Sequence, residues 1–99
     1  MTLRLGLREL EDALKEAGRD SNNAYRLNMI VREIDEDILF ELPDNEYVKE
    51  KVIPLFVRVI NTIRTSSATG QYSQYMGYFV HIINWRIDRL RKGYLKKAA

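Results

Sequence analysis

Hydrophobic residues recur at helical spacing along most of the chain. Near the N-terminus, Leu3, Leu7, Leu10 and Leu14 follow one another at intervals of three and four residues, which places them on one face of a helix. Three further stripes keep this spacing: Leu27, Ile30, Val31, Ile34 and Ile38; Val48, Val52, Leu55, Phe56, Val59, Ile60 and Ile63; and Tyr72, Tyr75, Met76, Phe79, Ile82, Ile83, Ile87, Leu90 and Tyr94. No segment alternates apolar and polar residues as a strand does, so the pattern predicts an all-α fold.

Residues with known effects on helix ends set the expected boundaries, which are 3–17, 22–41, 44–64 and 72–96, with a flexible polar loop at 65–71. The second helix should stop before Pro43, because a residue that precedes proline is pushed out of the helical region. Asp44 can cap the third helix, and Pro54 within that helix predicts a kink or a restart. We therefore expect a single helical domain over residues 1–99, a compact antiparallel bundle of about four helices.

Composition excludes several classes of chemistry. The 99 residues include no Cys and one His, which excludes disulfides, thiolate metal sites and thiol catalysis. As a general base, His81 would need an orienting carboxylate or a nucleophile, yet no acidic residue lies between Glu50 and Asp88. We interpret His81 as a partly buried structural residue. The chain is expected to be no enzyme and to use no cofactor, no metal ion and no small-molecule substrate.

Two weaker motifs have simple structural interpretations. The acidic run Glu33, Asp35, Glu36 and Asp37 could suggest a cation site, but helical spacing sends these side chains to different faces, so a solvated surface is preferred. The hydroxyl-rich stretch 65–70 precedes a helix, as some anion sites do, but it lacks the ending of a phosphate loop. A plain helix connector is the preferred interpretation of that stretch.

Charge is unevenly distributed, although the net formal charge is only +2. Residues 33–50 hold eight acidic residues and one basic residue, for a formal charge of −7, whereas residues 84–99 hold six basic residues and one acidic residue, for +5. Such blocks either form solvated helix faces or receive partners of opposite charge. Whether the two blocks meet within one molecule is left open by the pattern.

The last helix combines an apolar side with an almost wholly basic one. Ile83, Ile87 and Leu90 share the apolar side, and the spacing predicts that Arg89 and Lys92 project from the opposite side. Basic residues near a helix C-terminus favourably complement its dipole, but they can also contact phosphates or an acidic protein. Large aromatic residues outside the core stripe are typical of interfaces. The candidate contact residues are Tyr78, Trp85, Arg86, Arg89, Arg91, Lys92 and Lys96. Gly77 in mid-helix is tolerable if another helix packs closely there, and together with these aromatic residues it points to an oligomer or a complex with another protein.

Targeting signals are not expected. The first 16 residues place charges in every turn, unlike a signal peptide. The longest weakly polar stretch, residues 75–85, is far shorter than the about 20 residues that a membrane-spanning helix needs. We expect a soluble intracellular protein of the cytoplasm that does not bind membranes.

Residues 29–95 resemble the helical domain of the GINS family, whose subunits form a replication complex. An acidic helix runs into a Leu-Pro-Asp turn in MIVREIDEDILFELPDNEYVKEKV, followed by the apolar helix VIPLFVRVINTI and, after a polar loop, by the aromatic and basic run YFVHIINWRIDRLRKGYL. The N-terminal helix is additional to the family pattern, and the small β-domain that usually accompanies the helical domain is absent. The resemblance implies a non-enzymatic scaffold that packs on sister subunits and engages helicase or polymerase partners, at the nucleoid or in the nucleus. The positions that it marks are the turn residues Leu42, Pro43, Asp44 and Tyr47 and the row Arg86, Arg89 and Arg91.

These patterns together predict a protein–protein interaction or scaffold module of a multi-subunit assembly, linked by the resemblance to DNA replication. Its partner is another protein or further copies of the chain. The alternative is a small nucleic-acid-binding protein that uses the basic C-terminal helix.

Overall fold

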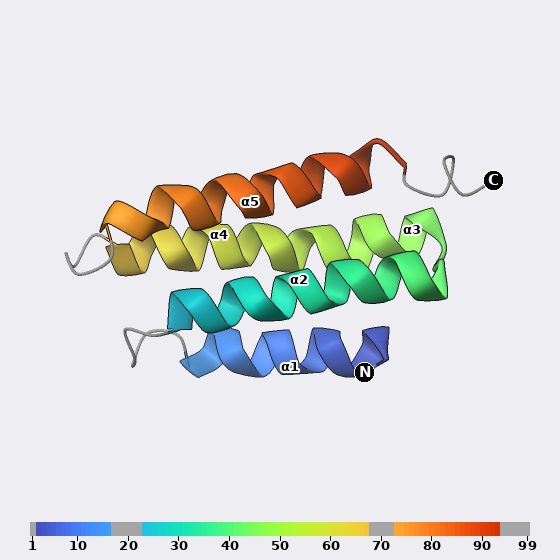
Figure 1. Ribbon diagram of the computed structural model, residues 1–99. Coiled ribbons are helices and arrows are strands. Elements are labelled where there is room, and N and C mark those ends of the chain that lie inside the picture. Colours follow the sequence, from blue (N-terminus) through green and yellow to red (C-terminus); the bar gives the residue numbers. More distant parts are fainter. Residues whose placement is uncertain (1, 17–22, 68–72, 94–99) are drawn as a thin grey trace.

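The apolar stripes of the sequence become helices that pack side by side. The computed structural model describes residues 2–16, 23–67 and 73–93, and these ranges contain helices and no strand. The elements are α1 (Leu3–Glu16), α2 (Asn23–Glu41), α3 (Asn45–Tyr47), η1 (Val48–Val52), α4 (Ile53–Ser67) and α5 (Ser73–Arg91). The last residue of α3, the π-helical turn η1 and α4 follow one another directly, so these three elements form one continuous rod (Figure 1). The fold is the all-α, antiparallel four-helix bundle that the periodicity predicts.

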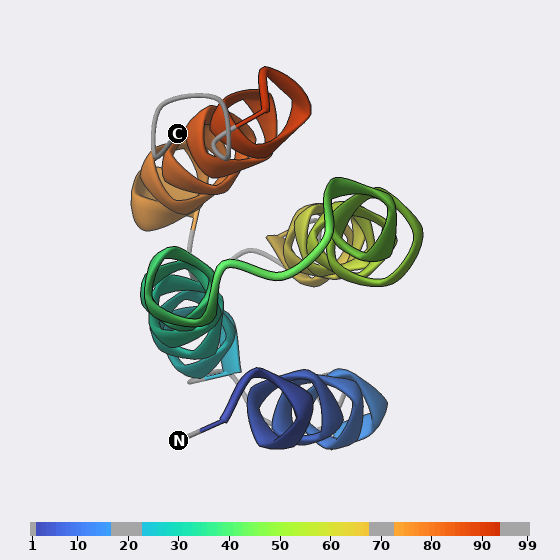
Figure 2. The ribbon, with the colours of Figure 1, turned by 90° about the vertical axis from the view of Figure 1, so that its right-hand side faces the viewer.

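Successive helices run in opposite directions (Figure 1). Viewed along the bundle, α2 and α4 lie in the middle, while α1 and α5 lie on opposite sides of them (Figure 2). This arrangement makes α2 and α5 parallel neighbours, and likewise α1 and α4. Within the described ranges, none of the helices is both long enough and apolar enough to cross a membrane.

One hydrophobic core joins all four long helices. Leu10 of α1, Ile34 of α2, Phe56 of α4 and Ile83 of α5 are all completely buried. Each belongs to the apolar stripe predicted for its helix. Burying a side chain of this kind stabilises the fold by about 1.5–3 kcal/mol. The four stripes therefore face a shared interior.

The turn after α2 has the helix end and the helix cap that the sequence predicts. α2 ends at Glu41, and the Leu42 N–H donates to the carbonyl of Ile38 at 2.9 Å. Leu42 takes a left-handed conformation with φ of 48°. Asp44 caps the next helix, because its Oδ1 accepts a hydrogen bond from the Glu46 N–H at 2.7 Å. The predicted stop before Pro43 and the predicted Asp44 cap are both confirmed.

A kink or a restart was expected at Pro54, but the structure has a continuous π-helical turn just before this residue instead. Proline has no N–H, so it cannot donate to the carbonyl of Glu50 as an ordinary helical residue would, and its ring would clash with that carbonyl. The turn Val48–Val52 is wound more widely, and the Ile53 N–H donates to the carbonyl of Val48. The rod continues through Pro54 without breaking.

Two helix ends differ from the expected boundaries. α4 reaches Ser67 instead of residue 64, and the Thr65 hydroxyl donates to the Asn61 carbonyl at 2.8 Å within this extension. Residues 65–67 of the predicted loop are therefore helical, and the rest of that loop lies outside the described residues. α5 ends at Arg91 instead of residue 96, because Gly93 adopts a left-handed conformation with φ of 82° and its N–H returns to the carbonyl of Leu90.

Candidate interaction surface

A buried charge cluster joins α2 to α5. The Asp35 side chain is only 5% exposed, and its Oδ2 accepts a hydrogen bond from Nη1 of Arg86 at 2.7 Å. Its Oδ1 is bound by Nη2 of Arg89. Both arginines are largely covered, with side-chain exposures of 15% and 22%. One carboxylate therefore holds two guanidinium groups from a helix more than fifty residues further along the chain.

This cluster corrects two expectations. Asp35 was predicted to lie on a solvated face, but it is the one charged residue buried among those that the structure describes. Arg89 was predicted to project away from the apolar side, but it turns towards α2. The reason is that α2 packs along this flank of α5, so a position that a lone helix would expose is covered. The acidic and basic blocks thus meet within one molecule.

Aromatic side chains line the outer side of the α2–α5 contact. Tyr25 of α2 meets Phe79 of α5 edge-on, with 6.5 Å between ring centroids, and Tyr78 lies 6.0 Å from the same ring. Trp85 lies two turns beyond Tyr78 on the same helical face, and the Arg89 guanidinium lies 5.9 Å from its ring centroid. We call Tyr25, Tyr78, Phe79, Ile82 and Trp85 the aromatic face.

The aromatic face is open. Tyr25, Tyr78 and Trp85 are 62%, 63% and 58% exposed, whereas Phe79 and Ile82 are half-buried beneath them. Tyr78 and Trp85 were predicted as contact residues because they fall outside the apolar stripe. Tyr25 was not, because it precedes the apolar stripe of its own helix and only the packing of α2 against α5 brings it to this face.

The remaining basic candidates lie in the sequence at the C-terminal end of α5 or beyond it. Arg91, Lys92 and Asp88 are all exposed. On α2, Arg32 pairs with Glu36 at 3.4 Å on the surface. Lys96 lies outside the described residues. Exposed charged residues of both signs therefore occur on α2 and at the end of α5.

The predicted interface turn divides into structural and exposed residues. Asp44 is occupied as a helix cap, and Tyr47 packs against the core. Pro43 is half-buried, whereas Leu42 is exposed. Phe40, the residue that sequence reasoning missed here, is almost fully exposed at the end of α2. The sequence could have indicated Phe40, because it is an aromatic residue outside the apolar stripe that includes Ile34 and Ile38.

The structure corrects the interpretation of His81 but does not test that of Gly77. His81 is exposed instead of partly buried. A Cβ added at Gly77 would meet no atom of the described chain within 4 Å, so within this chain no helix packs closely there, and the interpretation of Gly77 as a sign of an oligomer stays a prediction. Among the described residues, no group of three or more His, Asp or Glu side chains could hold a metal ion.

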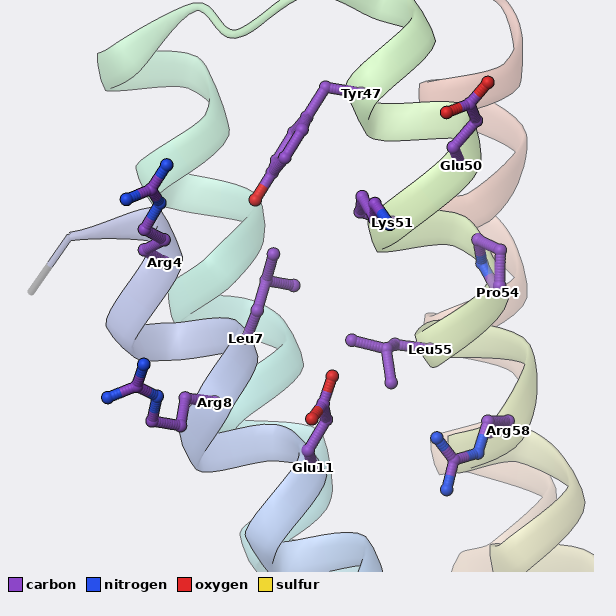
Figure 3. A pocket seen from close by; sticks show the side chains of 10 residues that line it. All are labelled: Arg4, Leu7, Arg8, Glu11, Tyr47, Glu50, Lys51, Pro54, Leu55 and Arg58. Atoms are coloured by element: carbon purple, nitrogen blue, oxygen red, sulfur yellow. The ribbon is translucent and has the colours of Figure 1, made fainter.

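A second surface feature lies between α1 and α4. A groove of about 380 Å³ runs between these two parallel helices, with Leu7 and Leu55 on opposite sides of the gap (Figure 3). Long charged side chains form its walls. Its lining residues are Arg4, Leu7, Arg8, Glu11, Tyr47, Glu50, Lys51, Pro54, Leu55 and Arg58.

Comparison of the chain with models of protein families, with curated proteins and with solved structures gives no match. The resemblance to the GINS helical domain therefore stays a prediction from the quoted motifs.

Proposed function

We propose that this chain is a non-enzymatic protein–protein interaction module of a multi-subunit assembly, and that the aromatic face is its contact surface. The observation that carries the proposal is the exposure of Tyr25, Tyr78 and Trp85 on the neighbouring helices α2 and α5, where Tyr25 and Tyr78 both contact Phe79. Tyr and Trp dominate the binding energy of protein interfaces, where they cluster near the centre of the contact.

The charges around the aromatic face favour a protein partner over nucleic acid. A phosphate backbone selects surfaces with several unpaired cations. Here Asp35 already binds Arg86 and Arg89, Glu36 pairs with Arg32, and Asp88 lies beside Arg91 and Lys92. A rim of mixed charge around large aromatic residues is typical of a protein interface.

The buried cluster of Asp35, Arg86 and Arg89 also supports a role in protein–protein interaction. Because Asp35 ties α5 to α2, the aromatic residues of the two helices keep fixed relative positions. A preorganised surface loses less conformational entropy on binding than a mobile one. The link to DNA replication is supported by the sequence resemblance alone, which would place a sister subunit at the turn Leu42–Tyr47.

The test compares the wild-type chain with the double variant Tyr78→Ala/Trp85→Ala. Light scattering and sedimentation measure self-association, and affinity purification with mass spectrometry identifies bound proteins. We expect the double variant to lose the self-association or the bound protein that the wild type shows. Leu5→Ala is the matched control, because Leu5 is 55% exposed on α1 and lies outside this face.

Two results would contradict the proposal. The first is a wild-type chain that stays monomeric and retains no protein. The second is a chain that binds DNA or RNA at low salt and loses this binding in Arg91→Glu/Lys92→Glu while Tyr78→Ala/Trp85→Ala retains it. That second result would establish the nucleic-acid alternative.

A further inference from the structure

The groove between α1 and α4 carries charges that the described chain leaves unpaired. Its walls contribute four basic and two acidic side chains. Within residues 2–16, 23–67 and 73–93, none of these six side chains lies at ion-pair distance from an oppositely charged group. By contrast, the basic residues Arg26, Arg32, Arg86 and Arg89 all have carboxylate partners.

On each wall of the groove, the charged residues follow one another at the spacing of one helical face. On α1, Arg4, Arg8 and Glu11 follow at intervals of four and three residues. On the opposite wall, Tyr47, Lys51 and Arg58 follow one face of the rod formed by η1 and α4. The eleven steps along the helix from Tyr47 to Arg58 rise about 16 Å, so this wall of the groove has the length of about three helical turns.

The lining of the groove is mixed, with apolar side chains beside the charged ones. Leu7 and Leu55 are nearly buried beneath the charged walls, and the exposed Pro54 ring lies beside Leu55 in the sequence. A helix bound in a groove uses apolar residues at intervals of three and four as anchors and places its polar residues along the rims. The groove has apolar side chains that could receive such anchors and charged side chains that could contact the polar residues of a bound helix.

We propose that this groove binds an acidic amphipathic helix of a partner protein. The carboxylates of that helix would pair with Arg4, Arg8, Lys51 and Arg58, and its apolar side would cover Leu7, Pro54 and Leu55. Glu11 and Glu50 in the same walls disfavour a continuous polyanion such as nucleic acid, whereas a helix can place a basic or neutral residue opposite each of them. The groove lies on different helices from the aromatic face, so this inference is independent of the proposed function.

The experiment uses two fluorescein-labelled 14-residue peptides, measured by fluorescence anisotropy at low salt. Both peptides carry leucine at helical intervals of three and four; the remaining positions are mostly glutamate in one peptide and mostly lysine in the other. We expect the wild-type chain to bind the glutamate peptide more tightly than the lysine peptide. In Arg8→Glu/Arg58→Glu, affinity for the glutamate peptide should fall at least tenfold, and the preference should reverse.

The control is Arg91→Glu/Lys92→Glu, which changes the net charge by the same amount at two exposed positions at the end of α5 and directly after it. It should retain the preference for the glutamate peptide. Equal losses in the two double variants, or no binding of the glutamate peptide by the wild type, would overturn the proposal. Self-association that Arg8→Glu/Arg58→Glu abolishes would also overturn it, since a second copy of the chain would then occupy the groove. Circular dichroism verifies that each variant retains its helices.

Discussion

Leu42 illustrates how a single residue changes the direction of the chain between two helices. It is the one described residue other than glycine with a positive φ, and left-handed backbone costs an L-residue about 1–2 kcal/mol. Its N–H still closes the last turn of α2 on Ile38, and Pro43 and the Asp44 cap follow at once. The strain is therefore located at the corner between α2 and α3, next to the exposed Phe40.

We expect Leu42→Gly to leave the free energy of unfolding unchanged or to raise it by up to about 1 kcal/mol, because glycine adopts positive φ without strain. Leu39→Gly is the matched control, since both leucines are 48% exposed but Leu39 lies within α2. The control should lose about 1 kcal/mol, the usual cost of glycine within a helix. Urea denaturation measures both values, and equal losses would show that Leu42 is not strained.

At the scale of the element, α1 depends on α2 for its first turn. The N–H of Leu3, one of the donors left free at a helix start, donates to Oε1 of Glu41 at 3.0 Å. Thr2 supplies a second acceptor, since its Oγ1 accepts from the Leu5 N–H at 3.3 Å. The negative charge of Glu41 also complements the positive end of the α1 dipole. The end of one helix thus caps the start of its neighbour.

Glu41→Ala should lower the free energy of unfolding by about 1 kcal/mol, the usual effect of losing an N-terminal cap. Hydrogen exchange at the Leu3 amide should accelerate more than exchange at Leu10, because the loss is confined to the first turn. Glu41→Gln retains an acceptor oxygen at the same position and should retain most of the protection. Unchanged exchange at Leu3 in Glu41→Ala would contradict this account.

At the scale of the whole molecule, the cluster of Asp35, Arg86 and Arg89 links the parallel helices α2 and α5. The Nε atoms of both arginines are buried and have no hydrogen-bond partner among the described residues. Two positive groups thus depend on a single carboxylate. Removing that carboxylate would leave both guanidinium groups largely covered and uncompensated.

Asp35→Ala is therefore expected to lower the free energy of unfolding by about 3–5 kcal/mol, the usual cost of breaking a buried ion pair. Replacing all three residues, as Asp35→Leu/Arg86→Met/Arg89→Met, should restore stability to within about 1 kcal/mol of the wild type, or exceed it, because no charge is then left buried. Urea denaturation followed by circular dichroism measures both. A loss of less than about 1 kcal/mol in Asp35→Ala would show that the cluster does not hold α5 on α2.

Sequence reasoning was most successful where the cause is local. The stripes of α1, α2 and α4 each predicted a buried face, and the Pro43 stop and the Asp44 cap depend on residues within one turn of each other. It failed at Gly93, whose left-handed conformation ends α5 five residues before the predicted boundary. The sequence could have indicated this helix end, because Gly93 follows the basic residues of the last turn, Arg89 and Arg91.

The sequence alone determined the helices and their buried faces, because the period of an α-helix is a property of neighbouring residues. Tertiary structure decided which of the remaining side chains are exposed. Asp35 and its arginines are 51 and 54 positions apart, so no local pattern pairs them. Tyr25 meets Phe79, and Arg8 and Arg58 line one groove, only because α2 packs beside α5 and α1 beside α4. Both proposed surfaces result from this packing, since each combines side chains from helices that the chain connects only at a distance.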